Sequence, residues 1–321
     1  RTGLAASFAS PTPATSVSGS GSSPFDTIAP WKDIKTYSIS NGSLVAEGAT
    51  GFSYSDDCVV YIPEFYYTTW KDTTNSKHYW AISPTAQEGY VLHPGSGKYI
   101  GKYHANGTAS AMTSKTGLSP LVSTSLTDFR SGAKAKGAGW RMIDLAAWSA
   151  LQMLYIVEFA NWDSQTTLGT GLNTGSLAVE GTLDGAAYHT VKISGGENMY
   201  RGVVNPFSNA YQWTDGFLAN TTTGYISCVP SKYSDSTSNL NALGFSLPSS
   251  NWISGFGCNE KTAWAFVPCA STSTEAYVKD KIFTPTSSGA HGLFVGGNYN
   301  SNSNYGLFYF NANNSPSNTN G

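Results

Sequence analysis

Residues 145–161 read LAAWSALQMLYIVEFAN and carry the strongest helical signal in the chain. Asp144 stands directly before this run and can cap a helix, because its carboxylate can accept hydrogen bonds from the free amides of the first turn. Apolar residues occupy nearly every face of the helix, so we expect it to be buried on most sides. We interpret its Leu, Met and Trp side chains as core and not as a cofactor pocket.

A second helix is expected shortly before the first, where Thr124 or Ser125 can cap a segment that runs to Lys136 and ends at Gly137. Residues 58–70 (CVVYIPEFYYTTW) and 78–83 predict a strand hairpin, with Pro63 at an edge or a bulge. Further strands are expected at residues 98–104, 187–194, 199–204, 210–217, 293–295 and 307–312. Two helices, one of them strongly buried, packed with short antiparallel sheets and long loops, indicate an α+β fold.

The organisation along the chain is simple. Residues 1–23 (RTGLAASFASPTPATSVSGSGSS) are rich in Ser, Gly, Pro and Thr and predict a flexible linker or attachment arm. Residues 24–321 are expected to form a single domain. The sequence starts with Arg1 and not with Met, so we expect a processed or partial chain.

Charge is scarce in this protein. Only 12% of the residues are charged, about half the usual share of a soluble domain, and the net charge is −2. We therefore expect no nucleic-acid partner and no attraction to an anionic membrane. No apolar run approaches the roughly 20 residues that membrane insertion requires. Abundant Tyr, Trp, Gly, Ser and Thr favour a protein that works outside cells.

The four cysteines are Cys58, Cys228, Cys258 and Cys269. They form no CxxC pair, and no His stands at metal-ligand spacing from them. An even count permits two disulfides, but the low density of Cys favours buried free thiols. We expect no metal site and no cofactor.

Residues 296–321 (GGNYNSNSNYGLFYFNANNSPSNTNG) form a second distinctive stretch. No Asp, Glu, Lys or Arg occurs after Lys281, and the segment consists mainly of Asn, Ser, Gly, Tyr and Phe. Recognition surfaces of antibodies are enriched in the same residue types, because Tyr gives rigid contact area and Ser, Gly and Asn adapt their hydrogen bonds. A disordered polar tail is the alternative interpretation.

Strand periodicity across residues 307–312 argues against the disordered tail. Alternate side chains of a strand point to opposite faces, which places Phe308, Phe310 and Ala312 on a core face. The opposite face would show polar groups to solvent. The candidate ligand-binding residues are Asn298, Tyr299, Asn300, Asn302, Asn304, Tyr305, Tyr309, Asn311 and Asn313.

Three segments occur in a familiar order: Gly139-Trp140-Arg141, the run NPFSNAYQW at residues 205–213, and Gly296-Gly297. Together they resemble the formylglycine-generating-enzyme type of C-type-lectin fold. That family usually carries GN-V-W-E-W, for which residues 209–213 stand here with Ala, Tyr and Gln in place of Val, Trp and Glu. It also carries a closing segment that begins GG-S-W. The resemblance implies a C-type-lectin-like domain.

A subgroup of that fold is more similar still: phage tail and surface proteins that are targets of diversity-generating retroelements. The supporting segments are SPFD at residues 23–26, Pro30-Trp31, IPEFYY at 62–67, VEFAN at 157–161 and the Asn-rich 296–320. In such proteins the C-terminal segment is diversified at adenines of a template copy. Asn codons are rich in adenine, and single changes convert Asn to Tyr, Ser, Thr, Asp, His or Ile. The interleaved Asn, Tyr and Ser of residues 298–305 fit that process.

The resemblance implies a receptor-binding adhesin that binds a ligand without catalysis. It implies a location in the virion, at a phage tail tip, with a bacterial cell surface as the alternative. The partner would be a host cell-surface protein or glycan. The protein would assemble as a homotrimer or attach to other tail proteins.

Two other functions stay open, a degenerate oxidase of the formylglycine-generating type and a structural tail protein that binds nothing. The resembling enzymes bind copper through two cysteines five residues apart near the C-terminus, whereas Cys258 and Cys269 are farther apart and precede the final segment. Asp56-Asp57, or Glu158 with Asp163, could form the carboxylate pair of a glycosidase. Loop acids and a helix-end acid are the simpler interpretation.

Overall fold

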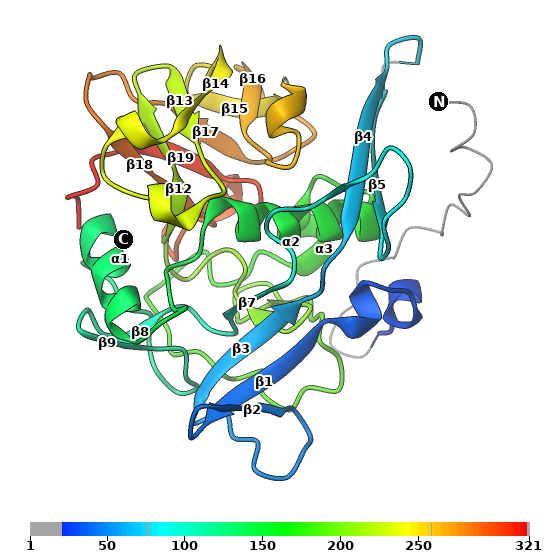
Figure 1. The fold of residues 1–321 in the computed structure, drawn as a ribbon, viewed down its shortest axis with the longest axis vertical. Coiled ribbons are helices and arrows are strands. Elements are labelled where there is room, and N and C mark those ends of the chain that lie inside the picture. Colours follow the sequence, from blue (N-terminus) through cyan, green and yellow to red (C-terminus); the bar gives the residue numbers. More distant parts are fainter. Residues whose placement is uncertain (1–20, 76, 258, 320–321) are drawn as a thin grey trace.

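Helix α2 (Leu145–Phe159) runs through the middle of the molecule (Figure 1). The computed structural model describes residues 21–75, 77–257 and 259–319. The carboxylate of Asp144 caps α2 by accepting a hydrogen bond from the Ala147 amide at 2.8 Å, as predicted. Every residue of α2 except Val157 is buried, which confirms the expected burial. The helix ends before residue 161 because Ala160 adopts the left-handed conformation, with φ 49°.

Two other α-helices occur in the described residues. Helix α1 (Leu126–Ala135) is confirmed, and the Ser125 hydroxyl caps it by accepting a hydrogen bond from the Asp128 amide at 3.1 Å. Helix α3 (Ser164–Leu168) was not predicted, because five residues are too few to show helical periodicity. No helix in this part of the chain combines the length and apolarity that crossing a bilayer requires.

The largest sheet covers one side of α2 (Figure 1). Its strand order is β14 (Asn241–Ser246), β13 (Thr223–Ile226), β12 (Gln212–Asn220), β18 (His291–Val295), β19 (Phe310–Asn314), β17 (Lys281–Phe283), β15 (Asn251–Phe256) and β16 (Pro268–Thr272). All neighbours are antiparallel except β17 and β19, which run parallel. The expectation of only short antiparallel sheets is therefore wrong for this one.

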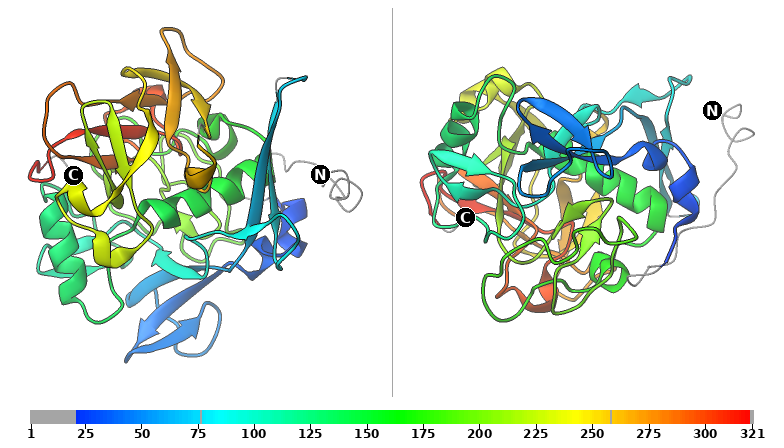
Figure 2. Two further views of the ribbon diagram at one scale, coloured as in Figure 1. Left: turned by 45° about the horizontal axis from the view of Figure 1, so that its top comes forward. Right: turned by 90° about the horizontal axis from the view of Figure 1, so that it is seen from below.

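A four-stranded sheet lies on the other side of α2, so that the helix is enclosed between two layers (Figures 1 and 2). Its strand order is β2 (Ser43–Ala46), β1 (Lys35–Ser40), β3 (Asp57–Ile62) and β7 (Lys98–Gly101). A three-stranded sheet consists of β5 (Lys77–Ser83), β4 (Tyr66–Asp72) and β6 (Val91–Leu92). Two small pairs are β8 (Asn106–Thr108) with β9 (Ala111–Thr113) and β10 (Met199–Tyr200) with β11 (Val203–Val204).

Short 3-10 helices and long loops connect these elements. The 3-10 helices are η2 (Pro24–Thr27), η3 (Trp31–Asp33), η4 (Pro230–Lys232), η5 (Thr237–Asn239), η6 (Glu260–Thr262) and η7 (Asn302–Asn304). Helices, sheets and loops together form an α+β protein, which confirms the predicted class.

The strand predictions are confirmed in part. The hairpin of β4 and β5 is present, but residues 58–70 are not one strand: the chain breaks at Pro63, and β3 and β4 belong to different sheets. Proline cannot donate to a sheet ladder, which explains the break. Residues 187–194 form only isolated bridges, and residues 199–204 turn back at Arg201 to give β10 and β11.

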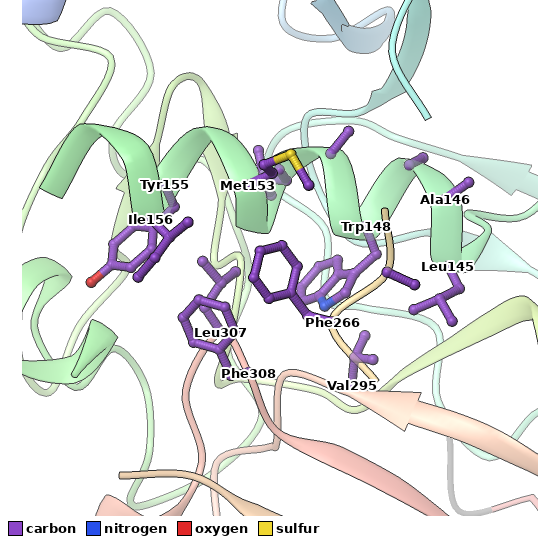
Figure 3. Packing of buried hydrophobic residues seen from close by; sticks show 14 of the residues in the cluster. Leu145, Ala146, Trp148, Met153, Tyr155, Ile156, Phe266, Val295, Leu307 and Phe308 are labelled. Atoms are coloured by element: carbon purple, nitrogen blue, oxygen red, sulfur yellow. The ribbon is translucent and has the colours of Figure 1, made fainter. Parts of the chain in front are cut away.

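The core joins α2 to both layers. Val60 and Ile62 of β3 lie in the same buried cluster as Phe217 of β12 and Phe310 of β19. Figure 3 shows Leu307 and Phe308 beneath α2, beside Tyr155 and Phe266. The ring of Phe308 lies 5.9 Å from that of Tyr155 and 5.6 Å from that of Phe266. The C-terminal segment is therefore anchored in the centre of the molecule.

Glu158 of α2 is part of a buried polar network. Its carboxylate accepts hydrogen bonds from Arg201 Nε at 3.1 Å, from the Tyr200 hydroxyl at 3.0 Å and from the Ser23 hydroxyl at 2.7 Å. Asp163 instead caps α3. The two acids thus have separate structural roles, Glu158 in the buried network and Asp163 at the start of α3. Ser23, expected in the linker, belongs to the folded domain; residues 1–20 lie outside the described residues.

The cysteines differ from the expectation of free thiols. Cys58 and Cys228 are free, but Cys269 is disulfide-bonded, so that expectation is wrong for Cys269. Cys258 lies outside the described residues. Burial raises the pKa of the Cys58 thiol to about 12, so this side chain behaves as a small apolar group.

The burial of α2 gives a direct prediction. Leu151 and Leu154 are both fully buried, and replacing either by Ala should lower the free energy of unfolding by about 2–5 kcal/mol through lost burial and a cavity. Val157→Ala is the matched control, because Val157 is the one partly exposed residue of α2. Denaturant unfolding measures all three variants. Losses below about 1 kcal/mol for both Leu variants would contradict the position of α2 in the core.

Candidate functional site

The turn before β19 is held by side chains from distant parts of the sequence. Asp280 accepts hydrogen bonds from the amides of Gly306 and Phe308, the latter at 2.8 Å. Ser164 Oγ accepts one from the Leu307 amide at 2.9 Å, and Gln152 Nε2 donates to the Leu307 carbonyl at 2.9 Å. These contacts give hydrogen-bond partners to the backbone groups of a buried segment without regular structure. Leaving such groups unpaired would cost free energy.

Two features of this turn leave little room for change. A Cβ added at Gly306 would lie 2.3 Å from Ser164 Oγ, so any other residue would displace the hydroxyl that holds Leu307. Asp280 is fully buried, and burial raises the pKa of its carboxyl group well above the usual range. The amides of Phe308 and Gly306 act in the opposite direction, because they favour the charged form.

The loop of residues 296–305 rests on the NPFSNAYQW run. The Ser208 amide donates to the Gly296 carbonyl at 2.7 Å, and the Tyr299 amide donates to the Asn209 carbonyl at 3.1 Å. Gly297 has φ 71°, and a Cβ there would lie 2.6 Å from Cβ of Tyr305. Close packing therefore requires glycine at position 297, and the φ of 82° favours it at position 296.

A third support comes from the loop around Asn173. Its backbone carbonyl accepts a hydrogen bond from the Asn302 amide at 3.2 Å, and its Nδ2 donates to the Asn302 carbonyl at 2.9 Å. These bonds involve only the backbone of Asn302, so its side chain is not needed for them.

Glu180 holds the NPFSNAYQW run in place through buried hydrogen bonds. Its carboxylate accepts hydrogen bonds from His104 Nδ1 at 2.6 Å, Asn205 Nδ2 at 2.8 Å and Asn209 Nδ2 at 3.0 Å. Burial favours a higher pKa for Glu180, but His104 and the two amides hold the pKa below its usual range. Glu180 is therefore a buried, charged acceptor that fixes the residues under the 296–305 loop.

The predicted burial of three side chains of the C-terminal segment is confirmed. Phe308, Phe310 and Ala312 are buried, with exposed fractions of 1%, 2% and 0%. The prediction that Tyr309 points to solvent is wrong, because its exposed fraction is only 1%. Residues 307–309 form a turn, and the strand begins at Phe310, so strand alternation does not apply to Tyr309.

Tyr309 belongs to an aromatic cluster under the surface. Its ring centroid lies 4.4 Å from that of Tyr305, 5.9 Å from Phe283 and 6.0 Å from Tyr211. The Tyr309 hydroxyl accepts a hydrogen bond from Asn311 Nδ2 at 2.9 Å. Tyr309 therefore supports its neighbours instead of contacting a ligand.

The other candidate residues reach the surface. Asn300, Asn302 and Asn313 are exposed, whereas Asn298, Tyr299, Asn304, Tyr305 and Asn311 are half-buried. We call these eight residues the asparagine–tyrosine face. The Tyr305 ring on Tyr309, and the Asn311 amide on the Tyr309 hydroxyl, bring the loop and the strand together.

Some members of this face are already engaged. Asn298 Oδ1 accepts hydrogen bonds from Ser301 Oγ at 2.8 Å and from the Asn300 amide at 3.0 Å. Asn311 Oδ1 accepts one from the Asn313 amide at 3.1 Å. Asn298 and Asn311 therefore shape the backbone, and Asn300 and Asn302 are freer to contact a ligand. Asn313 is exposed, and its Oδ1 accepts a hydrogen bond from Asn314 Nδ2 at 2.9 Å.

The contributors to this site that the sequence did not predict include Tyr211, Phe283 and Asn173, besides the buried supports Asp280, Ser164, Gln152 and Glu180. Tyr211 lies within the NPFSNAYQW run, so its position in a quoted motif was a usable signal. Phe283 and Asn173 gave none, because their roles depend on contacts with residues more than twenty positions away.

The chemistry of the face is that of neutral hydrogen bonding and aromatic contact. Residues 282–319 contain no Asp, Glu, Lys or Arg. Across residues 21–75, 77–257 and 259–319, no three or more His, Cys, Asp or Glu side chains come together in a way that could hold a metal ion. No family model matches the chain, and a search of curated proteins finds no match either.

The Glu180 network predicts a pH-dependent stability. Because the pKa of Glu180 is lowered on folding, its stabilisation is complete above the unfolded value of about 4.3 and is lost as the pH falls through the folded-state pKa. Glu180→Gln should therefore cost about 1–3 kcal/mol at neutral pH, and less in acid. Urea unfolding of both proteins between about pH 3 and pH 7 measures this difference. A difference independent of pH would show that Glu180 is not charged in the folded protein.

Proposed function

We propose that the protein is a C-type-lectin-like adhesin that binds its ligand through the asparagine–tyrosine face. The proposal rests on one observation: the side chains that hold the backbone of residues 306–308 are different from the side chains that the segment exposes to solvent. Asp280, Ser164 and Gln152 hold the backbone of the segment, and all three lie outside it. Exposed side chains of the segment can then change with little effect on folding, since surface substitutions usually shift stability by less than about 0.5 kcal/mol.

The aromatic cluster supports a role in recognition. Tyr305 is half-buried and rests on the buried ring of Tyr309, so it presents a preorganised aromatic edge at low entropic cost. The exposed amides of Asn300, Asn302 and Asn313 add hydrogen-bond donors and acceptors to the same face. This combination suits a neutral ligand, such as a glycan or an uncharged patch of a protein.

We place this activity at the tip of a phage tail, with a bacterial cell surface as the second possibility. The ligand would be a host surface protein or glycan, and attachment as a homotrimer or to other tail proteins would multiply weak sites through effective concentration. Diversification of the face is part of this proposal. A near-copy of the coding region for residues 296–321, differing at adenines and beside a reverse-transcriptase gene, would support it; invariant copies in sibling genomes would not.

A binding experiment tests the proposal. The triple variant Asn300→Ala, Asn302→Ala, Asn313→Ala and the single variant Tyr305→Ala should bind much more weakly to cells that the unaltered protein labels. An aromatic anchor contributes roughly 2 kcal/mol or more, which corresponds to a loss of about thirtyfold for Tyr305→Ala. Flow cytometry with fluorescently labelled protein on a panel of bacterial strains measures this loss.

The matched control replaces three exposed asparagines elsewhere, Asn75, Asn239 and Asn241, by Ala. The control should bind like the unaltered protein, and the Asn300/Asn302/Asn313 variant should keep its unfolding free energy within about 0.5 kcal/mol per site. Equal binding by the control and the face variants would place the ligand elsewhere on the molecule. If the unaltered protein labels none of the strains, the adhesin proposal is contradicted.

A further inference from the structure

A groove lies between the four-stranded sheet and residues 138–147, at the start of α2. Its volume is about 460 Å³, which falls in the range of small-molecule sites. Aliphatic side chains form most of its wall, and Tyr99 and Trp140 add aromatic surface. The aliphatic members include Ile39, Leu44, Val59, Ile100, Met142 and Ile143.

The mouth of the groove exposes apolar surface. Leu44 is 47% exposed and Tyr99 is 46% exposed, and the two lie on β2 and β7 of the same sheet. Tyr99 continues into a row of aromatic rings, with centroids 4.9 Å from Tyr61, and 5.9 Å from Tyr37. Apolar contact area at the rim of a hollow is typical of a ligand site.

The charges of the groove are unequal. Three charged side chains line it: Lys98, Arg141 and Asp144. Asp144 is buried and occupied, because its carboxylate caps α2, accepts a hydrogen bond from the Tyr233 hydroxyl at 3.0 Å and lies 3.5 Å from Lys98 Nζ. Arg141 is exposed and forms no ion pair with any residue that the structure describes. One uncompensated positive charge therefore stands beside an apolar hollow.

We propose that this groove binds a small amphiphilic anion, an apolar chain or ring that carries one carboxylate or sulfonate group. The aliphatic wall would bury the apolar part, and Arg141 would pair with the anion through its planar guanidinium group. A single cation and a hollow of this volume fit a free small molecule. A membrane surface would instead call for a cluster of basic residues. This site lies apart from the asparagine–tyrosine face and does not depend on it.

Calorimetric titration of the full chain with sodium octanoate, sodium decanoate, 1-octanol and octylammonium tests the proposal. Octanoate should bind more tightly than octanol, and octylammonium least tightly. Each buried methylene contributes about fourfold, so decanoate should bind about fifteenfold more tightly than octanoate. Equal affinity for octanoate and octanol, binding of none of the four probes, or binding to phosphatidylglycerol vesicles without binding to decanoate would each overturn the proposal.

Two variants locate the site. Arg141→Gln should weaken octanoate binding at least about fivefold and leave octanol binding unchanged, since a hydrogen bond to a charged group is worth at least that ratio. Leu44→Asp should abolish binding of octanoate and decanoate. The matched controls are Lys261→Gln, an exposed cation elsewhere, and Leu118→Asp, an exposed leucine outside the groove. All four positions are exposed, so the variants should fold; unchanged octanoate affinity in Arg141→Gln would refute the role of Arg141.

Discussion

Three side chains hold the backbone of residues 306–308 inside the protein through hydrogen bonds. The C-terminal half of the structure depends on these hydrogen bonds. Asp280 and Ser164 accept from its amides, and Gln152 of α2 donates to its carbonyl. This turn places Phe308 against Tyr155 of α2 and starts β19, which links β18 to β17 within the large sheet. Residues on either side of the turn reach the surface, where they form the asparagine–tyrosine face.

Several of the few charged side chains of the protein are buried and hydrogen-bonded in the interior. Arg201 pairs with Asp26 at the start of the domain and with Glu158 at the end of α2. Glu180 accepts hydrogen bonds from three residues under the 296–305 loop. Arg130 of α1 binds Asp215 of β12 through two hydrogen bonds of 2.8 and 2.9 Å. Such buried pairs are costly to break from one side, by about 3–5 kcal/mol, so they fix loops that have little regular structure of their own. The low charge content is therefore compatible with strong polar organisation.

Short sequence patterns predicted the elements whose structure depends mainly on residues close together in the chain. The uninterrupted apolar run and its Asp144 cap predicted α2, and the alternation of Phe308, Phe310 and Ala312 predicted their burial, although Phe308 lies in the turn before β19. Tyr309 was misplaced because the turn is held by Asp280, a long-range contact that overrides strand periodicity. Strands such as β14 (NALGFS) were not predicted, because Gly and polar residues have low strand propensity. This segment is a strand because it pairs with β13. Of the site, the sequence indicated the displayed asparagines but neither Phe283 nor Asn173.

Native-state hydrogen exchange tests most directly whether a rigid turn supports a changeable surface. The amides of Leu307 and Phe308 donate to Ser164 and Asp280 in the core, and they should exchange only through global unfolding. The amide of Asn300 bonds only to the side chain of Asn298 at the surface and should exchange much faster, through local fluctuations. Slow exchange at Leu307 and Phe308 beside fast exchange at Asn300 is the predicted result. Fast exchange at Leu307 and Phe308 would show that the segment is not held by the core, and it would contradict the account.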